Sequence, residues 1–302
     1  MAQPEKLFVM AGMPRAGTTY IYQALQAHPD VFLPFRKELS FFTINHARGA
    51  AWYRSFFRQA RTHQICGDIS PDYFLHPAAL PRLHAFSPRP KVILAVRDPA
   101  AWAVSFHRHI ATFEWRVPAF ADFLRRHPVP DNRLMNFRDR HKRATFAIAD
   151  ALVERTLEEY RHTFGPDLLI YSFDLFRSSP LTVMRAIEQF LDLPPKLVES
   201  QLPAGAINSS RRRNSRLLSY LLSREELITT ADHLLPRSLM RATRGKFDRF
   251  TSAAPQPPPV DPDYNRDLVL ARTHLASDCR YVETLLARAP IQFGDGRAFP
   301  VP

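Results

Sequence analysis

The stretch FVMAGMPRAGTTYIYQAL, residues 8–25, is the part of the chain from which the fold can be predicted most directly. A short apolar segment leads into a loop flanked by Gly12 and Gly17, and a pair of threonines then begins an apolar helical pattern. A strand, a loop of this spacing and a helix in that order are typical of a phosphate-binding P-loop. The lysine position of the motif holds Thr18, however, and the loop carries its positive charge at Arg15. Without that lysine, the motif does not indicate nucleoside triphosphate hydrolysis.

The remaining parts of the loop still form a good anion site. Gly17 allows a close approach of the backbone, and the N–H groups and dipole at the helix start favour a bound phosphate. Arg15 lies where it can neutralise charge on a leaving group, and the threonine hydroxyls add two donors. The alternative is an ordinary strand, turn and helix with Pro-Arg as the turn. The residues that we predict to contact a 5′-phosphate are Arg15, Ala16, Gly17, Thr18, Thr19 and Tyr20.

Four more apolar runs rich in Val, Ile and Leu follow along the chain, at residues 31–34, 64–70, 91–97 and 167–174. We expect helices near residues 18–27, 99–112, 148–163 and 180–191, and a long one near 263–288. Strands that alternate with helices indicate βαβ units and a parallel sheet covered on both faces. The predicted fold is therefore a single α/β domain over residues 1–302, with a P-loop-type parallel sheet flanked by helices. Residues 113–143 and 203–260 are expected to be helical insertions or lid segments.

Composition narrows the class of protein without naming its partner. The 302 residues are 45% hydrophobic, which is enough for a large core, and the formal net charge of +12 favours anionic partners. Cys66 and Cys279 lie far apart and show no zinc or disulfide spacing, so we expect no metal site. With neither a signal peptide nor an apolar run of about 20 residues, a cytoplasmic location is expected. The basic segment 211–250 is interpreted as a surface helical hairpin or a membrane-surface helix, so peripheral membrane contact stays open. The sequence does not indicate the oligomeric state.

A second anion site is predicted from KVILAVRDPAAWAVSFHRHI, residues 91–110. Arg97 ends a buried strand, Asp98 and Pro99 begin a helix, and Ser105 follows two turns into that helix. Arg97 and Ser105 can converge on one anion at the carboxyl end of the sheet. The alternative is a common structural pairing of the strand-end Arg with Asp98. Together with the first loop, the pattern suggests a nucleotide that has two separate phosphate positions.

The loop GMPRAGTT and the segment VRDPAAWAVSFHRHI, in this order, resemble those of sulfotransferases that use 3′-phosphoadenosine-5′-phosphosulfate (PAPS). The resemblance implies that the first loop cradles the 5′-phosphosulfate and that Arg97 and Ser105 bind the 3′-phosphate. Such a donor has no β- or γ-phosphate, which would explain the missing lysine. The family usually has Lys where Arg15 stands. The resemblance further implies that Arg211 and Arg213, in the basic run 207–216, cover the 3′-phosphate, although such a run is as often simply solvated.

The segment PFRKELSFF, residues 34–42, resembles the K-E-x-H-F-F stretch of heparan sulfate and related carbohydrate sulfotransferases. The match implies that Glu38 is the catalytic base, which takes the proton of an acceptor hydroxyl or amine. In the alternative, Glu38 is a surface partner of Lys37 or Arg36. Ser40 replaces the family's histidine, so the part that this histidine plays is open.

The segment CGDISPDYF, residues 66–74, resembles the family's E-K-[ST]-P-x-Y stretch, a strand end that faces the acceptor. Asp68, Ser70 and Tyr73 match it in kind. Ile69 replaces the family's lysine, which argues against a heparan-type acceptor more than against sulfonate transfer.

The resulting prediction is a PAPS-dependent sulfotransferase that acts on a hydroxyl or amine of a carbohydrate or secondary metabolite. One alternative is a P-loop kinase of a small metabolite, which would need Mg²⁺ and a substitute for the missing lysine. Another is a non-catalytic binder of polyanions, suggested by the net charge of +12. The sequence has no RNA-binding aromatic motif and no zinc finger, so we expect no nucleic-acid partner.

Overall fold

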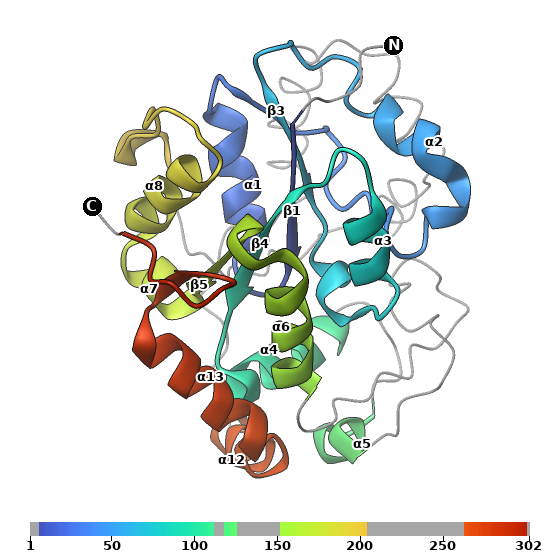
Figure 1. Ribbon diagram of the computed structural model, residues 1–302. Coiled ribbons are helices and arrows are strands. Elements are labelled where there is room, and N and C mark those ends of the chain that lie inside the picture. Colours follow the sequence, from blue (N-terminus) through green and yellow to red (C-terminus); the bar gives the residue numbers. More distant parts are fainter. Residues whose placement is uncertain (1–5, 112–117, 126–151, 204–262, 301–302) are drawn as a thin grey trace, which may run out of the picture.

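The structure is a computed structural model that describes residues 6–111, 118–125, 152–203 and 263–300 (Figure 1). Its centre is a six-stranded sheet with the strand order β2-β3-β1-β4-β5-β6. The first five strands are parallel, and the last runs antiparallel to β5. The strands are β1 (Leu7–Gly12), β2 (Val31–Phe32), β3 (Ile65–Ile69), β4 (Lys91–Val96), β5 (Leu168–Ser172) and β6 (Ile291–Phe293). The predicted α/β class is confirmed, with a mostly parallel sheet in place of a wholly parallel one.

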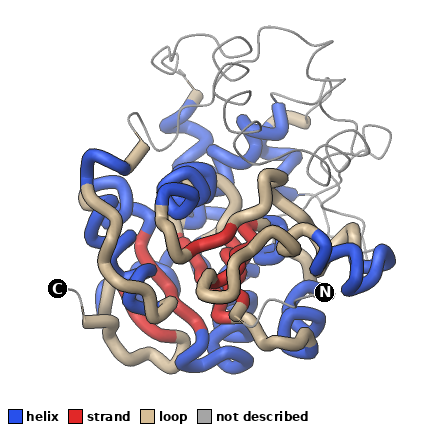
Figure 2. Tube along the Cα trace, turned by 90° about the horizontal axis from the view of Figure 1, so that it is seen from above, coloured by secondary structure: helices blue, strands red, loops and turns tan. Residues whose placement is uncertain are grey.

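The helices cover both faces of this sheet. On one face lie α1 and α8, and on the other lie α3 and α6 (Figure 1), while Figure 2 shows the strands in the centre. The α-helices are α1 (Thr18–Ala27), α2 (Gly49–Ser55), α3 (Ala79–Ala85), α4 (Pro99–Ala111), α5 (Phe120–Arg125), α6 (Leu152–Phe164), α7 (Phe173–Ser178), α8 (Pro180–Phe190), α12 (Tyr264–His274) and α13 (Ala276–Arg288). Short 3₁₀ helices are η1 (His46–Arg48), η2 (Pro71–Leu75), η3 (Gly165–Asp167) and η4 (Glu199–Gln201).

The strand order creates a switch point between β1 and β4. The chain leaves β1 toward the β2 edge of the sheet, and it leaves β4 in the opposite direction, toward β5. In open α/β sheets, ligands bind beyond the carboxyl ends of the strands at such a point. The phosphate loop follows β1 and Arg97 follows β4, so the topology brings the two predicted anion motifs side by side.

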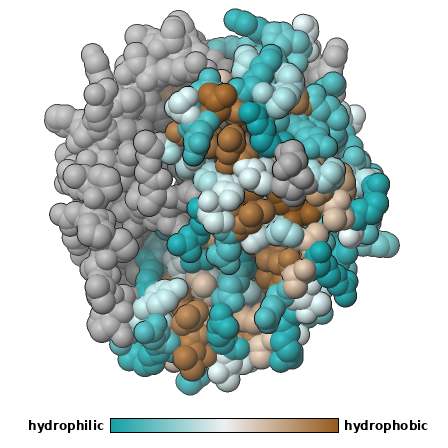
Figure 3. Space-filling view, turned by 90° about the vertical axis from the view of Figure 1, so that its left-hand side faces the viewer, coloured by the Kyte–Doolittle hydropathy of each residue, from teal (hydrophilic) through white to brown (hydrophobic). Residues whose placement is uncertain are grey.

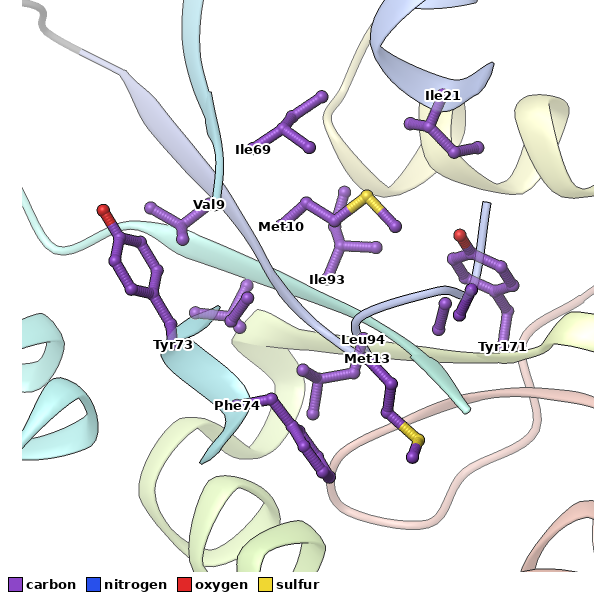
Figure 4. Packing of buried hydrophobic residues seen from close by; sticks show 14 of the residues in the cluster. Val9, Met10, Met13, Ile21, Ile69, Tyr73, Phe74, Ile93, Leu94 and Tyr171 are labelled. Atoms are coloured by element: carbon purple, nitrogen blue, oxygen red, sulfur yellow. The ribbon is translucent and has the colours of Figure 1, made fainter. Parts of the chain in front are cut away.

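The core forms because the central strands are buried on both faces, which is why they read as continuous apolar runs. Met10 of β1 is in register with Ile69 of β3 and Ile93 of β4, and these side chains lie on the α1 side of the sheet (Figure 4). Val9 lies on the opposite side, toward Tyr73 of η2. All five residues are almost completely buried. This core fixes where along the sheet β1 and β4 end, and therefore where the loops that follow them lie.

The region predicted as one long helix near 263–288 is two helices, so this expectation was wrong. The chain breaks at Leu275, whose backbone angles (φ −111°, ψ 37°) are not helical. Leu275 is fully buried, and the two helices pack on different partners: α12 against α4, and α13 mainly against α6. No Gly or Pro marks the break in the sequence.

The antiparallel β6 was also not predicted, because a three-residue strand has too short a pattern to be recognised.

Several other expectations concern parts of the chain that the structure does not describe. Most of 113–143 lies outside the described residues, apart from residues 118–125, which contain α5. Residues 204–262 also lie outside them, including Arg211, Arg213 and the basic segment 211–250. The single-domain organisation and the cytoplasmic location stay predictions.

Few large hydrophobic side chains are exposed among the described residues. They are those of Val198, Tyr264 and Val269. On the face drawn in Figure 3, hydrophobic residues form separate patches among hydrophilic ones. Among the helices in the described ranges, none is long and apolar enough to cross a membrane.

Candidate active site

The phosphate loop ends in an open helix N-terminus. Gly17 precedes α1 with φ 80°, a left-handed conformation that glycine adopts without strain. No side chain caps this end of α1, and its first turn contains no acidic residue. The partial positive charge of the helix dipole is therefore not neutralised by the cap or the first turn of α1, which suits an anion at this position.

The loop uses some of its own N–H groups. The N–H of Ala16 donates to the carbonyl of Met13 (3.3 Å), and that of Tyr20 donates to the carbonyl of Gly17 (2.9 Å). The N–H groups of Gly17 and the two following threonines donate to no group in the described part of the chain. The set of free donors is therefore narrower than the sequence suggested, and it is concentrated at the start of α1.

Tyr20 contributes mainly by packing. Its ring is buried and meets Phe176 of α7 edge-on, with the centroids 5.3 Å apart. Burial, followed by the charge of Glu199, raises the pKa of its hydroxyl. These contacts link α1 to the elements after β5, so Tyr20 stabilises the wall of the site.

Arg15 is the cation of the loop, and it forms no ion pair with a described residue. Its Nε is buried and has no hydrogen-bond partner in the described part of the chain. Burial lowers the pKa of its guanidinium. The residue has φ 62°, a left-handed conformation that is costly for a non-glycine residue. A half-buried cation whose buried Nε is an unused donor fits an anionic ligand, which would supply both the charge and the missing hydrogen bond.

Arg97 lies directly beside this loop. Its Nη1 donates to the carbonyl of Arg15 (3.2 Å), and its guanidinium lies over the ring of Phe173, 5.1 Å from the centroid. Burial lowers the pKa of Arg97, and the charge of Arg15 acts in the same direction. Ser105 lies two turns into α4 and is half-buried. Both cationic motifs lie at the carboxyl end of the sheet, as the sequence predicted, and the structure adds that Arg97 contacts the phosphate loop directly.

Glu38 lies at the same end of the sheet, on the segment that follows β2. Lys37 Nζ is 2.5 Å from Glu38 Oε1 and donates to the Thr18 hydroxyl at 3.4 Å. The Lys37 side chain is 14% exposed and that of Glu38 is 44% exposed. Glu38 thus has the lysine partner that the alternative interpretation supposed, but the pair adjoins the phosphate loop. Lys37 thus places beside this loop the ammonium group that the loop sequence lacks. In the sequence, the only sign of this role was the position of Lys37 directly before Glu38.

His109 is a second residue that sequence reasoning missed. It lies one helical turn after Ser105 on α4, close enough to Arg15, Lys37 and Glu38 for their charges to act on it. Burial and then the charge of Arg15 lower the pKa of His109 to about 4. Its imidazole is therefore neutral at pH 7 and offers one donor and one acceptor. The spacing of four from Ser105 was the signal that could have identified it.

The segment predicted to face the acceptor supports the turn that carries Glu38, and its place beside an acceptor stays a prediction. Asp68 is 1% exposed and accepts hydrogen bonds from the hydroxyls of Ser70 (2.6 Å), Tyr73 (2.7 Å) and Tyr53 (3.2 Å). Burial raises the pKa of Asp68, whereas these hydrogen bonds lower it. Both carboxylate oxygens of Asp68 are therefore engaged by hydroxyl groups of the core.

Comparison with known proteins identifies the family. The family model of the sulfotransferase domain matches residues 5–242. This chain belongs to that family. It is similar to heparan sulfate glucosamine 3-O-sulfotransferase 6 of Homo sapiens, with 35% identity over 124 residues, 41% of this chain and 35% of that protein. It is also similar to heparan sulfate glucosamine 3-O-sulfotransferase 3B1 of Mus musculus, with 29% identity over 186 residues, 61% of this chain and 45% of that protein.

A solved structure supports the same fold. The crystal structure of a sulfotransferase from Alicyclobacillus acidocaldarius has a TM-score of 0.53 and 21% identity, and the match covers 80% of this chain and 97% of that one. At this identity the likeness shows the fold alone. This sulfotransferase-family chain spans less than half the length of the two curated relatives named above.

Proposed function

We propose that this chain transfers a sulfonate group from PAPS to a hydroxyl or amine of a carbohydrate or secondary-metabolite acceptor. The observation that carries the proposal is Arg15, a half-buried cation whose buried Nε has no partner among the described residues, at the open N-terminus of α1. Its neighbour Arg97, on the adjacent strand end, supports a donor with a second phosphate group. Membership of the sulfotransferase family supports the reaction class.

In this proposal the residues of the chain divide the work as follows. The N–H groups at the start of α1 hold the 5′-phosphate of the donor, which supplies the sulfonate group. Arg15 neutralises the charge that grows on the phosphate as it leaves. Glu38 accepts the proton of the acceptor while the acceptor oxygen or nitrogen bonds to sulfur. Lys37, between Glu38 and Thr18, orients the carboxylate toward the donor loop.

The relatives and the sequence also bear on the chemical class of the acceptor. Two of the relatives are named for heparan sulfate glucosamine, which supports a carbohydrate acceptor. Ser40 and Ile69 stand where the family has a histidine and a lysine, which favours a different acceptor from the one in those names. The net charge of +12 favours an anionic sugar or an anionic secondary metabolite.

A small-molecule kinase is a second candidate because of one specific observation. A kinase with this loop would need a lysine from elsewhere, and Lys37 lies within 3.4 Å of the Thr18 hydroxyl. Such a kinase would also need Mg²⁺ to bridge the phosphates. The two candidates therefore differ in their nucleotide and in their need for the metal.

We expect adenosine 3′,5′-bisphosphate, the product of PAPS, to raise the melting temperature of the protein in the presence of EDTA. The reason is that a ligand that binds only the folded state stabilises it by an amount that grows with the logarithm of its concentration relative to Kd. Thermal unfolding with this nucleotide, with ATP and Mg²⁺, and with heparin separates the candidates. A shift with ATP and Mg²⁺ alone would support the kinase, and a heparin shift that vanishes at high salt would support a polyanion binder.

We also expect Arg97→Ala and Ser105→Ala to weaken binding of adenosine 3′,5′-bisphosphate much more than binding of adenosine 5′-phosphate. A charge-assisted hydrogen bond contributes roughly 1.5–3 kcal/mol, so the loss of Arg97 should raise Kd by about tenfold or more. Calorimetry with both nucleotides measures the difference, with exposed Arg297→Ala as the control. Equal losses for both nucleotides would show that neither residue contacts the 3′-phosphate.

A further inference from the structure

A buried carboxyl group, that of Asp72, lies under the turn that carries Glu38. Asp72 belongs to η2 and is 7% exposed. Its Oδ2 accepts a hydrogen bond from the Thr43 hydroxyl (2.6 Å), and its carboxylate also interacts with the Ser40 hydroxyl. Its Oδ1 has no hydrogen-bond partner in the described ranges. Asp72 thus contacts the turn at two points and leaves one oxygen unused.

The turn itself has a conformation that L-residues avoid. Glu38 has φ 64° and Ser40 has φ 50°, both in the left-handed region. The N–H of Ser40 donates to Ser70 Oγ (3.2 Å), and the N–H of Phe41 donates to the Tyr73 hydroxyl (2.9 Å). Two left-handed residues in one short turn persist only when their surroundings hold them. The segment 68–73 supplies that support, and Asp72 is part of it.

Asp72 is a costly choice for support alone. Burial raises the pKa of its carboxyl group to about 7, and the charges of Glu38 and Asp68 act in the same direction, against the hydrogen bonds from Thr43 and Ser40. A neutral side chain of the same size, such as asparagine, could accept the Thr43 hydrogen bond without burying a charge. Residues that cost stability in this way are common at functional sites.

The titratable and charged groups around Asp72 are two carboxyl groups, two phenols and a guanidinium. Tyr73 of η2 and Tyr160 of α6 interact with it, and burial raises the pKa of both phenols far above neutrality. Arg82 of α3 is the nearby cation, and it donates to the carbonyls of Phe42 and Thr43. The charges that act on Asp72 are therefore mainly those of Glu38 and Asp68.

We propose that Asp72 is a positioning residue for Glu38, which it holds through Thr43 and Ser40 while its negative charge favours proton uptake by Glu38. The second effect follows because two like charges interact mutually, so that a charge on either carboxylate favours the proton on the other. This inference rests on the proposed role of Glu38 as the base. It assigns to Asp72 the support of the turn on which Ser40 stands in place of the family's histidine.

The proposal gives activity and stability opposite dependences on pH. Because the folded-state pKa of Asp72 lies above its ordinary value of 3.8, the folded protein holds a proton that the unfolded chain has lost. The stabilisation from this proton is complete below pH 3.8 and is lost as the pH rises through about 7. Turnover should instead rise through the same window, because the charged form of Asp72 assists Glu38.

The experiment compares Asp72→Asn and Thr43→Val with wild type and with Asp192→Asn, a control at an exposed carboxylate that pairs with Lys91. For both turn variants we expect kcat to fall by about tenfold or more, with the affinity for adenosine 3′,5′-bisphosphate unchanged. The rise of activity near pH 7 should disappear in Asp72→Asn. The melting temperature of Asp72→Asn minus that of wild type should increase between pH 5 and pH 8.5. The control should match wild type in kcat and in its pH profile.

The outcomes separate the two proposals. If wild type transfers sulfonate and Asp72→Asn keeps its kcat and the rise near pH 7, the assignment of Asp72 is overturned while the proposed function stands. A wild type that transfers no sulfonate group to any acceptor overturns both. If Asp72→Asn does not fold, Thr43→Val is the deciding variant, and Thr43→Ser tests for rescue. Equal kcat in Thr43→Val and wild type overturns the assignment of Asp72. A loss of kcat in Thr43→Val that Thr43→Ser restores supports the assignment.

Discussion

Replacing Glu38 by glutamine is expected to lower turnover with an alcohol acceptor by roughly 10²–10⁴-fold, the usual contribution of a positioned proton acceptor. The amide is nearly isosteric, so it can keep a hydrogen bond from Lys37, which now lies 2.5 Å from the Glu38 carboxylate. Donor affinity should therefore change little. Initial rates with radiolabelled donor, together with calorimetry of the product nucleotide, measure the two quantities separately.

The decisive comparison uses two acceptors of different acidity. A nitrophenol is already largely ionised near neutral pH, so it should lose much less than an alcohol when Glu38 is replaced. Glu283→Gln, an exposed substitution on α13, is the matched control and should change neither rate. If both acceptors lose the same factor, Glu38 only positions the substrate. The base would then be sought at His46, which is exposed, because Asp68 is buried and engaged with three hydroxyl groups.

Replacing Arg15 by alanine is expected to lower kcat by roughly 10²–10³-fold and to weaken donor binding much less. This magnitude is typical when one preorganised donor to a developing negative charge is removed. An interaction that is stronger in the transition state than in the ground state acts on the rate rather than on binding. Single-turnover rates at saturating donor, measured beside the Kd of the product nucleotide, distinguish the two effects.

Arg15→Lys is the matched variant for this test. Lysine keeps the positive charge. Lysine and alanine meet the same backbone cost at this position, where φ is 62°, so Arg15→Lys and Arg15→Ala differ chiefly in the charge of the side chain. Arg15→Lys should recover a large part of the lost turnover. A variant Arg15→Ala that binds donor weakly but turns over normally at saturation would make Arg15 a binding residue only.

Much of the fold was readable because its signals are local. The run LFVMAG predicted β1 at Leu7–Gly12, and the helical pattern after Gly17 predicted α1 at Thr18–Ala27, as observed. A strand buried on both faces gives a continuous apolar run, and a helix start depends on the few residues around it. The placement of both anion motifs at the carboxyl end of the sheet followed from the same logic, since parallel strands end at one edge of the sheet.

The errors arose where distant parts of the chain decide the conformation. The helix break at Leu275 has no local signal, because it depends on the packing of α12 on α4 and of α13 on α6. The strand β6 exists because β5 offers an edge on which Ile291–Phe293 can pair. Neither partner is visible in the short window from which a pattern is read.

For the candidate site, the sequence by itself determined the anion loop, the strand-end arginine and the glutamate after the second strand. Only the tertiary structure decided that Lys37 reaches Thr18, that His109 lies near Arg15, and that Asp72 supports the turn of Glu38. The physical reason is range. Backbone conformation and helix ends respond to neighbouring residues, whereas hydrogen bonds and charge coupling act between side chains that the folding of the sheet brings together.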